Sequence, residues 1–224
     1  MTPLCEVRVF SRCHRYAGTL DVLGLWHGTG ALVDYKTGSP SDVGAQWQTA
    51  AYYGALLEMI SHGDTPDMLA FDPIVHRYTL DGEVLPSVTQ ILQASGIIDF
   101  SRIPQPILLA ARDRGTAVHQ ACHYHNEDDL DVDAFAATYP AYWPYLSAWI
   151  DFRQDAGFEL ATSFAQLGAL THLKRYAVQL RNDGSYRVEL YTEPSDFPEF
   201  LTLLRAQELV ARHRGSWIES AEVA

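Results

Sequence analysis

The sequence has few cysteines, no long apolar run and no excess of positive charge, and each absence excludes a class of protein. No apolar run reaches the ~18 residues that a membrane-spanning helix needs, and residues 1–16 lack the apolar stretch of a signal peptide. The three cysteines, Cys5, Cys13 and Cys122, are irregularly spaced, which argues against a disulfide framework and against an all-thiolate zinc or iron–sulfur site. We therefore expect a cytoplasmic protein with reduced thiols and no membrane association.

The net charge of −12 over 224 residues argues against a nucleic-acid-binding protein, because such proteins are usually basic. Acidic residues are also metal ligands, however, and a bound cation reverses the local field. Part of the acidic excess lies in the run 127–133, which has the composition of a solvated loop. The charge alone therefore leaves a metal-dependent enzyme acting on nucleic acid open.

Apolar patterning and turn residues predict an α/β fold, with a mixed central sheet flanked by helices and a helical annex, in one domain over 1–224. A first part, 3–60, contains three strands and a helix that Ser41 or Asp42 would cap. A linker, 61–70, separates it from a hairpin and helical part, 71–160, and a closing hairpin and last helix occupy 172–224. The predicted strands cover 4–10, 16–26, 31–36 and the hairpins around Asp81-Gly82 and 182–185; the predicted helices cover 43–59, 87–92, the residues after Pro106, 141–155 and 198–213.

Two carboxylates and a lysine each lie at the edge of a β-like run of residues. Asp21 ends a short apolar run, and Asp34-Tyr35-Lys36 ends the next strand. Asp34 and Lys36 are two residues apart, so their side chains share one face of the strand. Carboxylate oxygens suit Mg²⁺ or Mn²⁺, and a neighbouring lysine can stabilise negative charge that develops during phosphodiester hydrolysis.

These residues stand in three short motifs: GTLD, then DYKTG, then QTAAY. The order of the motifs resembles the PD-(D/E)XK nuclease superfamily, in its RecB-like and lambda-exonuclease-like branch. The resemblance implies a restriction-endonuclease-like core with Mg²⁺ or Mn²⁺ as cofactor. It also implies that RGTAVH at 114–119 carries a histidine ligand and that a glutamate on the first strand is a further one. The implied metal ligands are Asp21, Asp34, His119 and Glu6; Lys36, Gln48 and Tyr52 complete the implied active site.

The segment order departs from the family pattern. In the family the histidine-bearing helix precedes the catalytic strands, whereas here RGTAVH follows them. Residues 71–160 resemble the part that should come first, and 3–60 resemble the part that should follow. We therefore expect a circularly permuted chain, in which residue 160 lies near residue 3.

Each of these residues also has a purely structural interpretation. Asp34 and Lys36 could form a surface ion pair, Asp21 could cap a turn, Glu6 could be a polar strand residue and His119 an ordinary helix histidine. Gln48 and Tyr52, one helical turn apart, could be a buried pair, and Gln46 is an alternative to Gln48. The aromatic residues of 142–149 favour core packing. Arg112 and Arg114 are candidate phosphate contacts or helix-surface residues in equal measure.

The expected function is that of a Mg²⁺- or Mn²⁺-dependent deoxyribonuclease, an exonuclease of recombination and repair or of phage origin. The expected partners are DNA and a recombination or single-strand-binding protein, and both a monomer and an oligomer agree with the sequence. Two other functions stay open: a non-catalytic DNA-binding or assembly module on the same fold, and a hydrolase of a small phosphorylated substrate.

Overall fold

The computed structural model describes residues 2–38, 43–192 and 196–214. The chain divides into two compact units whose segments alternate along the sequence. Strands β1 (Cys5–Ser11) and β2 (Tyr16–Trp26) each have residues in both units. The first unit comprises Met1–Val7, Leu20–Ala45 and Phe100–Thr192, and the second comprises Arg8–Thr19, Gln46–Asp99 and Glu193–Ala224.

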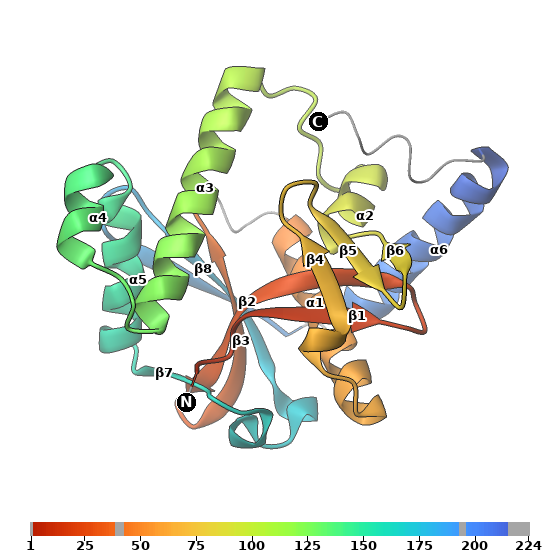
Figure 1. The fold of residues 1–224 in the computed structure, drawn as a ribbon, viewed down its shortest axis with the longest axis horizontal. Coiled ribbons are helices and arrows are strands. Elements are labelled where there is room, and N and C mark those ends of the chain that lie inside the picture. Colours follow the sequence, from red (N-terminus) through yellow and green to blue (C-terminus); the bar gives the residue numbers. More distant parts are fainter. Residues whose placement is uncertain (1, 39–42, 193–195, 215–224) are drawn as a thin grey trace. The chain divides into compact units, whose positions relative to one another are not determined.

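The first unit contains a mixed sheet, as the sequence predicts (Figure 1). Strand β3 (Thr29–Lys36) is antiparallel to β2 and parallel to β8 (Lys174–Leu180), which is antiparallel to β9 (Tyr186–Tyr191). The strand order is β1-β2-β3-β8-β9, and the short β7 (Phe158–Leu160) pairs with β2. Parallel pairing of β3 with β8 needs a long connection, and residues 37–173 supply it.

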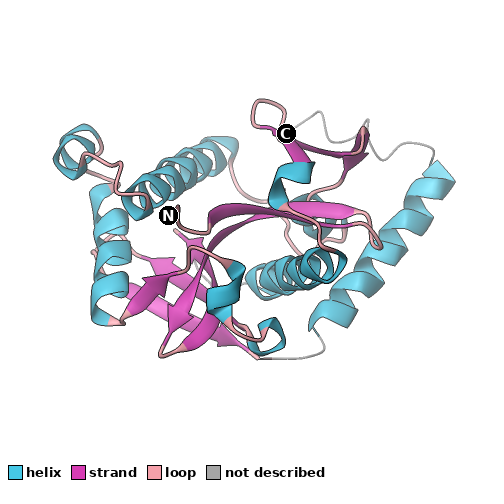
Figure 2. Cartoon of the chain, turned by 60° about the horizontal axis from the view of Figure 1, so that its bottom comes forward, coloured by secondary structure: helices cyan, strands magenta, loops and turns pink. Residues whose placement is uncertain are grey.

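Three helices of this unit accompany the sheet: α3 (Gln105–Asn126), α4 (Val132–Thr138) and α5 (Trp143–Asp155). Figure 2 shows them together beside the strands. Helix α5 packs against β7, β8, β9 and α3. One apolar cluster joins sheet and helices, and its largest side chain, Trp149, is fully buried. The buried aromatic residues of α5 therefore belong to the core, as the sequence predicts.

The second unit contains α1 (Val43–His62), a three-stranded sheet, α2 (Val88–Ala94) and α6 (Asp196–Arg214). Its sheet has the order β4 (Leu69–Asp72), β5 (Arg77–Leu80), β6 (Glu83–Leu85). Ser87 caps α2 in a capping box with Gln90. Tyr16 lies in the core of this unit, where its hydroxyl donates to the Ala51 carbonyl and its ring meets Phe200 edge-on at 5.1 Å.

Several predicted boundaries are wrong for identifiable reasons. Helix α1 continues to His62 and β4 begins at Leu69, so the predicted linker 61–70 is shorter. Helix α4 starts inside the predicted acidic loop because Asp131 caps it, accepting from the Ala134 amide at 2.9 Å. Strand β7 is too short to show a pattern. Helix α6 begins two residues before Pro198, which the first turn of a helix tolerates. The predicted caps Ser41 and Asp42 lie outside the described residues.

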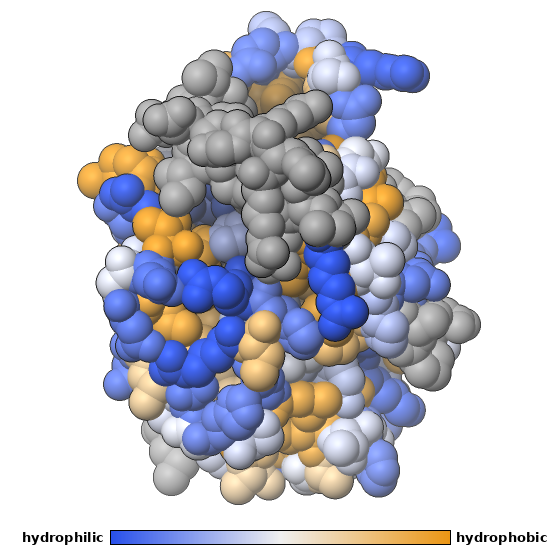
Figure 3. Space-filling view, turned by 90° about the vertical axis from the view of Figure 1, so that its right-hand side faces the viewer, coloured by the Kyte–Doolittle hydropathy of each residue, from blue (hydrophilic) through white to orange (hydrophobic). Residues whose placement is uncertain are grey.

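Some large hydrophobic side chains of the described residues are exposed, among them Ile74, Val75 and Ile107. On the face shown in Figure 3, hydrophobic residues lie in separate groups between hydrophilic ones. Among the described residues, no helix combines the length and the apolar character of a membrane span.

Candidate metal centre

Three side chains from three elements of the first unit converge: Glu6 on β1, Asp21 on β2 and His119 on α3. One ligand atom of each lies within 4.8 Å of the other two. The closest pair is His119 Nδ1 and Asp21 Oδ1, 3.3 Å apart. Among the described residues this is the one group of three or more histidine, cysteine or acidic side chains with metal-binding geometry. The structure thus brings together three of the four ligands expected from the sequence.

Asp21 lies just beyond the end of the hydrogen-bonded pairing between β2 and β3. The β2–β3 pairing runs from Trp26–Thr29 to Val22–Val33. At the next position the Asp21 carboxylate accepts a hydrogen bond from the Tyr35 backbone amide, with Oδ2 at 2.5 Å. One oxygen therefore secures β3, and the other faces His119. Asp21 is 6% exposed, so its charge lies where Coulomb interactions are strong.

Glu6 reaches the group through an unusual backbone conformation. Its φ of 50° lies in the left-handed region, which costs a non-glycine residue roughly 1–2 kcal/mol. The residues just before it are anchored: the Leu4 amide donates to the Ala161 carbonyl at 2.7 Å, and the Leu4 carbonyl accepts from Leu23 at 2.9 Å. Because side chains alternate along a regular strand, such a local distortion changes the direction in which Glu6 points.

Asp34 and Lys36 form a separate pair beside this group. Lys36 Nζ lies 2.7 Å from Asp34 Oδ2, and Asp34 is 2% exposed. Both lie where β3 pairs with Ala177 and Gln179 of β8. The Asp34 carboxylate is outside the three-residue group, although its charge interacts with those of Asp21 and His119. Asp34 and Lys36 therefore lie within electrostatic range of the candidate metal position.

Burial and neighbouring charges shift the pKa values of Glu6, Asp34 and His119. Burial, reinforced by the charge of Asp21, raises the pKa of Glu6 to about 7. Burial also raises the pKa of Asp34 to about 6, although Lys36 opposes the shift. For His119 burial lowers the pKa, but Asp21 and Glu6 outweigh it and bring the pKa to about 9. Perturbed groups of opposite sign in one cluster are typical of functional sites.

The donor set fits a hard divalent cation. Mg²⁺ and Mn²⁺ hold their ligands at about 2.1 Å, so two ligands of one ion lie about 3.0 Å apart when adjacent and about 4.2 Å when opposite. The 3.3 Å between Asp21 and His119 is close to the adjacent value. Glu6 places a carboxylate oxygen within 4.8 Å of both of these ligand atoms. Carboxylate oxygens are ligands of Mg²⁺ and Mn²⁺, and imidazole is a common ligand of transition-metal ions.

Gln48 and Tyr52 belong to the second unit, on α1. The Gln48 amide donates to the Tyr52 hydroxyl at 2.7 Å, so the predicted one-turn pairing is observed. A Cβ at position 18 would stand 2.4 Å from the Tyr52 ring, which explains the glycine of the GTLD motif. Gln46, the predicted alternative, donates to Asp196 at 2.6 Å instead.

Arg112 and Arg114 lie on α3, before His119. The Arg112 side chain is 64% exposed and 3.7 Å from Asp113. The Arg114 guanidinium lies over the Tyr145 ring at 5.4 Å. Arg112 is thus accessible to a phosphate, whereas Arg114 also contributes to packing between α3 and α5.

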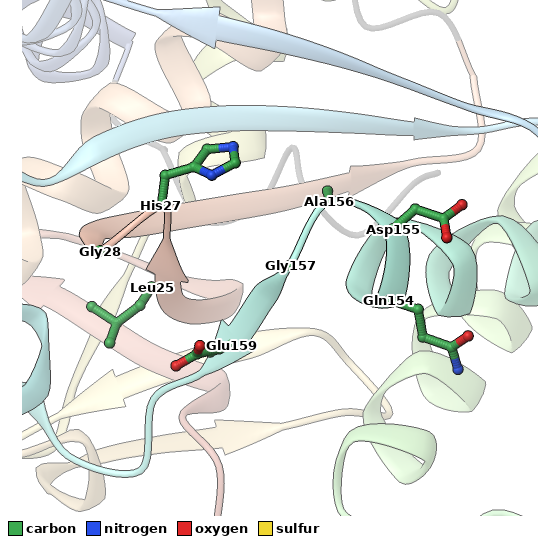
Figure 4. A pocket seen from close by; sticks show the side chains of 8 residues that line it. All are labelled: Leu25, His27, Gly28, Gln154, Asp155, Ala156, Gly157 and Glu159. Atoms are coloured by element: carbon green, nitrogen blue, oxygen red, sulfur yellow. The ribbon is translucent and has the colours of Figure 1, made fainter.

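A pocket elsewhere in the first unit is lined in part by His27, Asp155 and Glu159, but these side chains are not among the described residues that converge as a metal-binding group. It lies between the β2–β3 turn and the end of α5, and Figure 4 shows Gln154, Asp155 and Glu159 pointing in different directions. His123 is partly buried beside Glu127, with Nε2 3.5 Å from its carboxylate. Neither place adds a ligand to the candidate centre.

Two groups that support the candidate centre, the Tyr35 amide and the Asn126 side chain, were not predicted from the sequence. The Tyr35 amide is a backbone group and has no sequence signal. Asn126 binds the Tyr35 hydroxyl, with Nδ2 at 3.0 Å, and its spacing of two helical turns from His119 is the one signal that could have identified it. Comparisons with protein-family models, curated proteins and solved structures found no match.

Proposed function

We propose that the protein is a Mg²⁺- or Mn²⁺-dependent nuclease that hydrolyses DNA phosphodiester bonds as an exonuclease. The observation that carries the proposal is the convergence of Glu6, Asp21 and His119 next to the Asp34–Lys36 pair. A surface ion pair or an ordinary helix histidine would not require that side chains from three separate elements converge at one point. Apart from Glu6, these residues stand in the motifs that resemble the PD-(D/E)XK superfamily.

The proposed role of each residue follows from the chemistry of its side chain. Glu6, Asp21 and His119 would hold the ion, with Asp34 as a further ligand on rotation away from Lys36. The ion, when bound, polarises the phosphoryl oxygen and lowers the pKa of a coordinated water. Lys36, with its side chain 24% exposed, can orient water and stabilise charge on the phosphoryl oxygens. Arg112, on the surface of the His119 helix, is suited to bind the DNA backbone.

A circularly permuted restriction-endonuclease-like core is part of the proposal. The expectation that residues 160 and 3 lie close together agrees with the 2.7 Å hydrogen bond between Leu4 and Ala161. The segment that ends with β7 therefore meets the start of β1, as a chain joined there would require. The order of elements can then differ from the family pattern while the site keeps its residues.

The test is digestion of end-labelled linear DNA with Mg²⁺ or Mn²⁺, with EDTA as the metal-free control. The wild-type protein should shorten the DNA from its ends, and Asp21→Asn should not. Asp113→Asn is a matched control, because it also removes one negative charge but from a side chain that is 67% exposed on α3. A wild-type protein that binds DNA without cleaving it would instead be the non-catalytic module, and one that cleaves only small phosphate esters would be the small-substrate hydrolase.

A further inference from the structure

We infer that Asn126 is the positioning residue of the metal centre: its buried amide fixes β1, β3 and α3, the elements that carry or secure the three ligands. The inference rests on the proposed metal site. Asn126 is the last residue of α3 and is 3% exposed. It touches none of the ligand atoms in the contacts that the structure records, and it acts through its neighbours.

The Asn126 amide uses its full hydrogen-bonding capacity, which is two donors and two acceptor sites. Oδ1 accepts from Trp149 Nε1 at 2.9 Å and from Arg153 Nη1 at 3.2 Å. Nδ2 donates to the Tyr35 hydroxyl at 3.0 Å and to Cys5 Sγ at 3.4 Å. The indole N–H can only donate, so Oδ1 must face Trp149 and the amide has one allowed orientation.

Cys5 and Tyr35, the two residues to which Asn126 Nδ2 donates, are each connected to a proposed ligand. Cys5 is bonded covalently to Glu6, the residue with the left-handed backbone. Tyr35 holds the Asp21 carboxylate through its amide, and its ring meets the His119 ring edge-on at 5.5 Å. His119 and Asn126 are seven residues apart on α3, which places them on the same helix face about 10 Å apart along the axis.

On α5, Trp149 holds the hydrogen-bond network in place by packing in the core. Trp149 is fully buried and packs against the Tyr35 ring, with centroids 4.4 Å apart. Groups that orient ligands from behind normally raise metal affinity about 10- to 100-fold. Since Asn126 joins the supports of all three ligands, its removal should weaken the ion's binding by at least about tenfold.

The experiment measures Mn²⁺ binding by calorimetry and thermal unfolding for the same set of full-length variants. Asn126→Leu removes all four hydrogen bonds, and Tyr35→Phe removes only the Asn126–Tyr35 bond. Leu146→Ala is the control for lost stability, because Leu146 is fully buried on α5 but belongs to neither the network nor the ligand set. Tyr35→Phe serves as the test if Asn126→Leu does not fold.

Asn126→Leu and Tyr35→Phe should both raise the Mn²⁺ Kd, and the double variant should bind no more weakly than Asn126→Leu alone, because the two changes remove the same bond. Leu146→Ala should unfold at a lower temperature with an unchanged Mn²⁺ Kd. Wild-type Mn²⁺ affinity in both Asn126→Leu and Tyr35→Phe would overturn the positioning role while leaving the metal centre intact. A wild-type protein that binds no Mn²⁺ would overturn the metal centre and the proposed function with it.

Discussion

Lys36 Nζ lies 2.7 Å from the carboxylate of Asp34, two residues earlier on the same strand. The pair is asymmetric: Asp34 is almost wholly buried, and Lys36 keeps about a quarter of its side chain exposed. The lysine therefore neutralises a buried acid on one side and faces solvent on the other. Because the ammonium has two tasks, its removal should affect both activity and the protonation of Asp34.

Lys36→Ala should lower the rate of DNA cleavage by about 10²–10³-fold, the usual effect of losing one donor that stabilises the transition state. Burial would then raise the pKa of Asp34 further, since the cation that opposes the shift is gone. The matched control is Lys174→Ala, which removes the chain's only other lysine from an exposed position at the start of β8. Equal cleavage rates for the two variants would refute the role of Lys36.

Removing a proposed ligand should abolish metal binding without unfolding the protein. Asp21→Asn keeps an oxygen that can accept from the Tyr35 amide but loses the charge next to His119. We expect Mn²⁺ to raise the unfolding temperature of the wild-type protein and to leave that of Asp21→Asn unchanged, because only a ligand that binds the native state stabilises it. Thermal scans with and without EDTA measure this, and an equal response of both proteins contradicts the assignment.

The sequence predicts the local part of this site well and its long-range part poorly. Strand, turn and strand are consecutive, so the positions of Asp21, Asp34 and Lys36 follow from alternation and turn residues. The meeting of His119 with Asp21 does not follow from spacing, because it depends on how α3 packs on the sheet; only the motif resemblance indicated it. The left-handed φ of Glu6 is likewise invisible, since glutamate carries no preference for that conformation.

The division into two units could not be predicted from the sequence for a similar reason. Each unit is assembled from separated stretches of the chain, and no change in composition marks the boundaries between them. Helix α4 and strand β7 were missed because one is only seven residues long and the other three. Periodicity needs longer segments to be recognised.

The stability of the metal-free protein should depend on pH through Glu6. Its pKa is raised from 4.5 to about 7, chiefly by burial, so between these values the folded protein binds more protons than the unfolded chain. The contribution of Glu6 to stability is therefore complete below pH 4.5 and is lost as the pH rises to about 7. Glu6→Gln cannot ionise, so its unfolding temperature relative to wild type in EDTA should increase over this range; a pH-independent difference would contradict the shift.

Metal affinity should have the opposite pH dependence. Glu6 and His119 must lose their protons to act as ligands, and their pKa values are about 7 and about 9. The apparent Mn²⁺ affinity should therefore rise from pH 6 to pH 9, with less change below pH 7 in Glu6→Gln, where Asp34, with a pKa of about 6, and His119 still titrate. Calorimetry in several buffers also measures the protons released, and binding without proton release would contradict ligation by these two groups.

The backbone of Glu6 offers a test that separates its conformation from its carboxylate. Glu6→Gly and Glu6→Ala both remove the carboxylate, but only glycine adopts a φ of 50° without a steric penalty. Glu6→Gly should therefore be more stable than Glu6→Ala by about 1 kcal/mol in denaturant unfolding. Both variants should bind Mn²⁺ equally weakly. Equal stability would show that the left-handed conformation is not retained in solution, whereas wild-type Mn²⁺ binding by either variant would remove Glu6 from the ligand set.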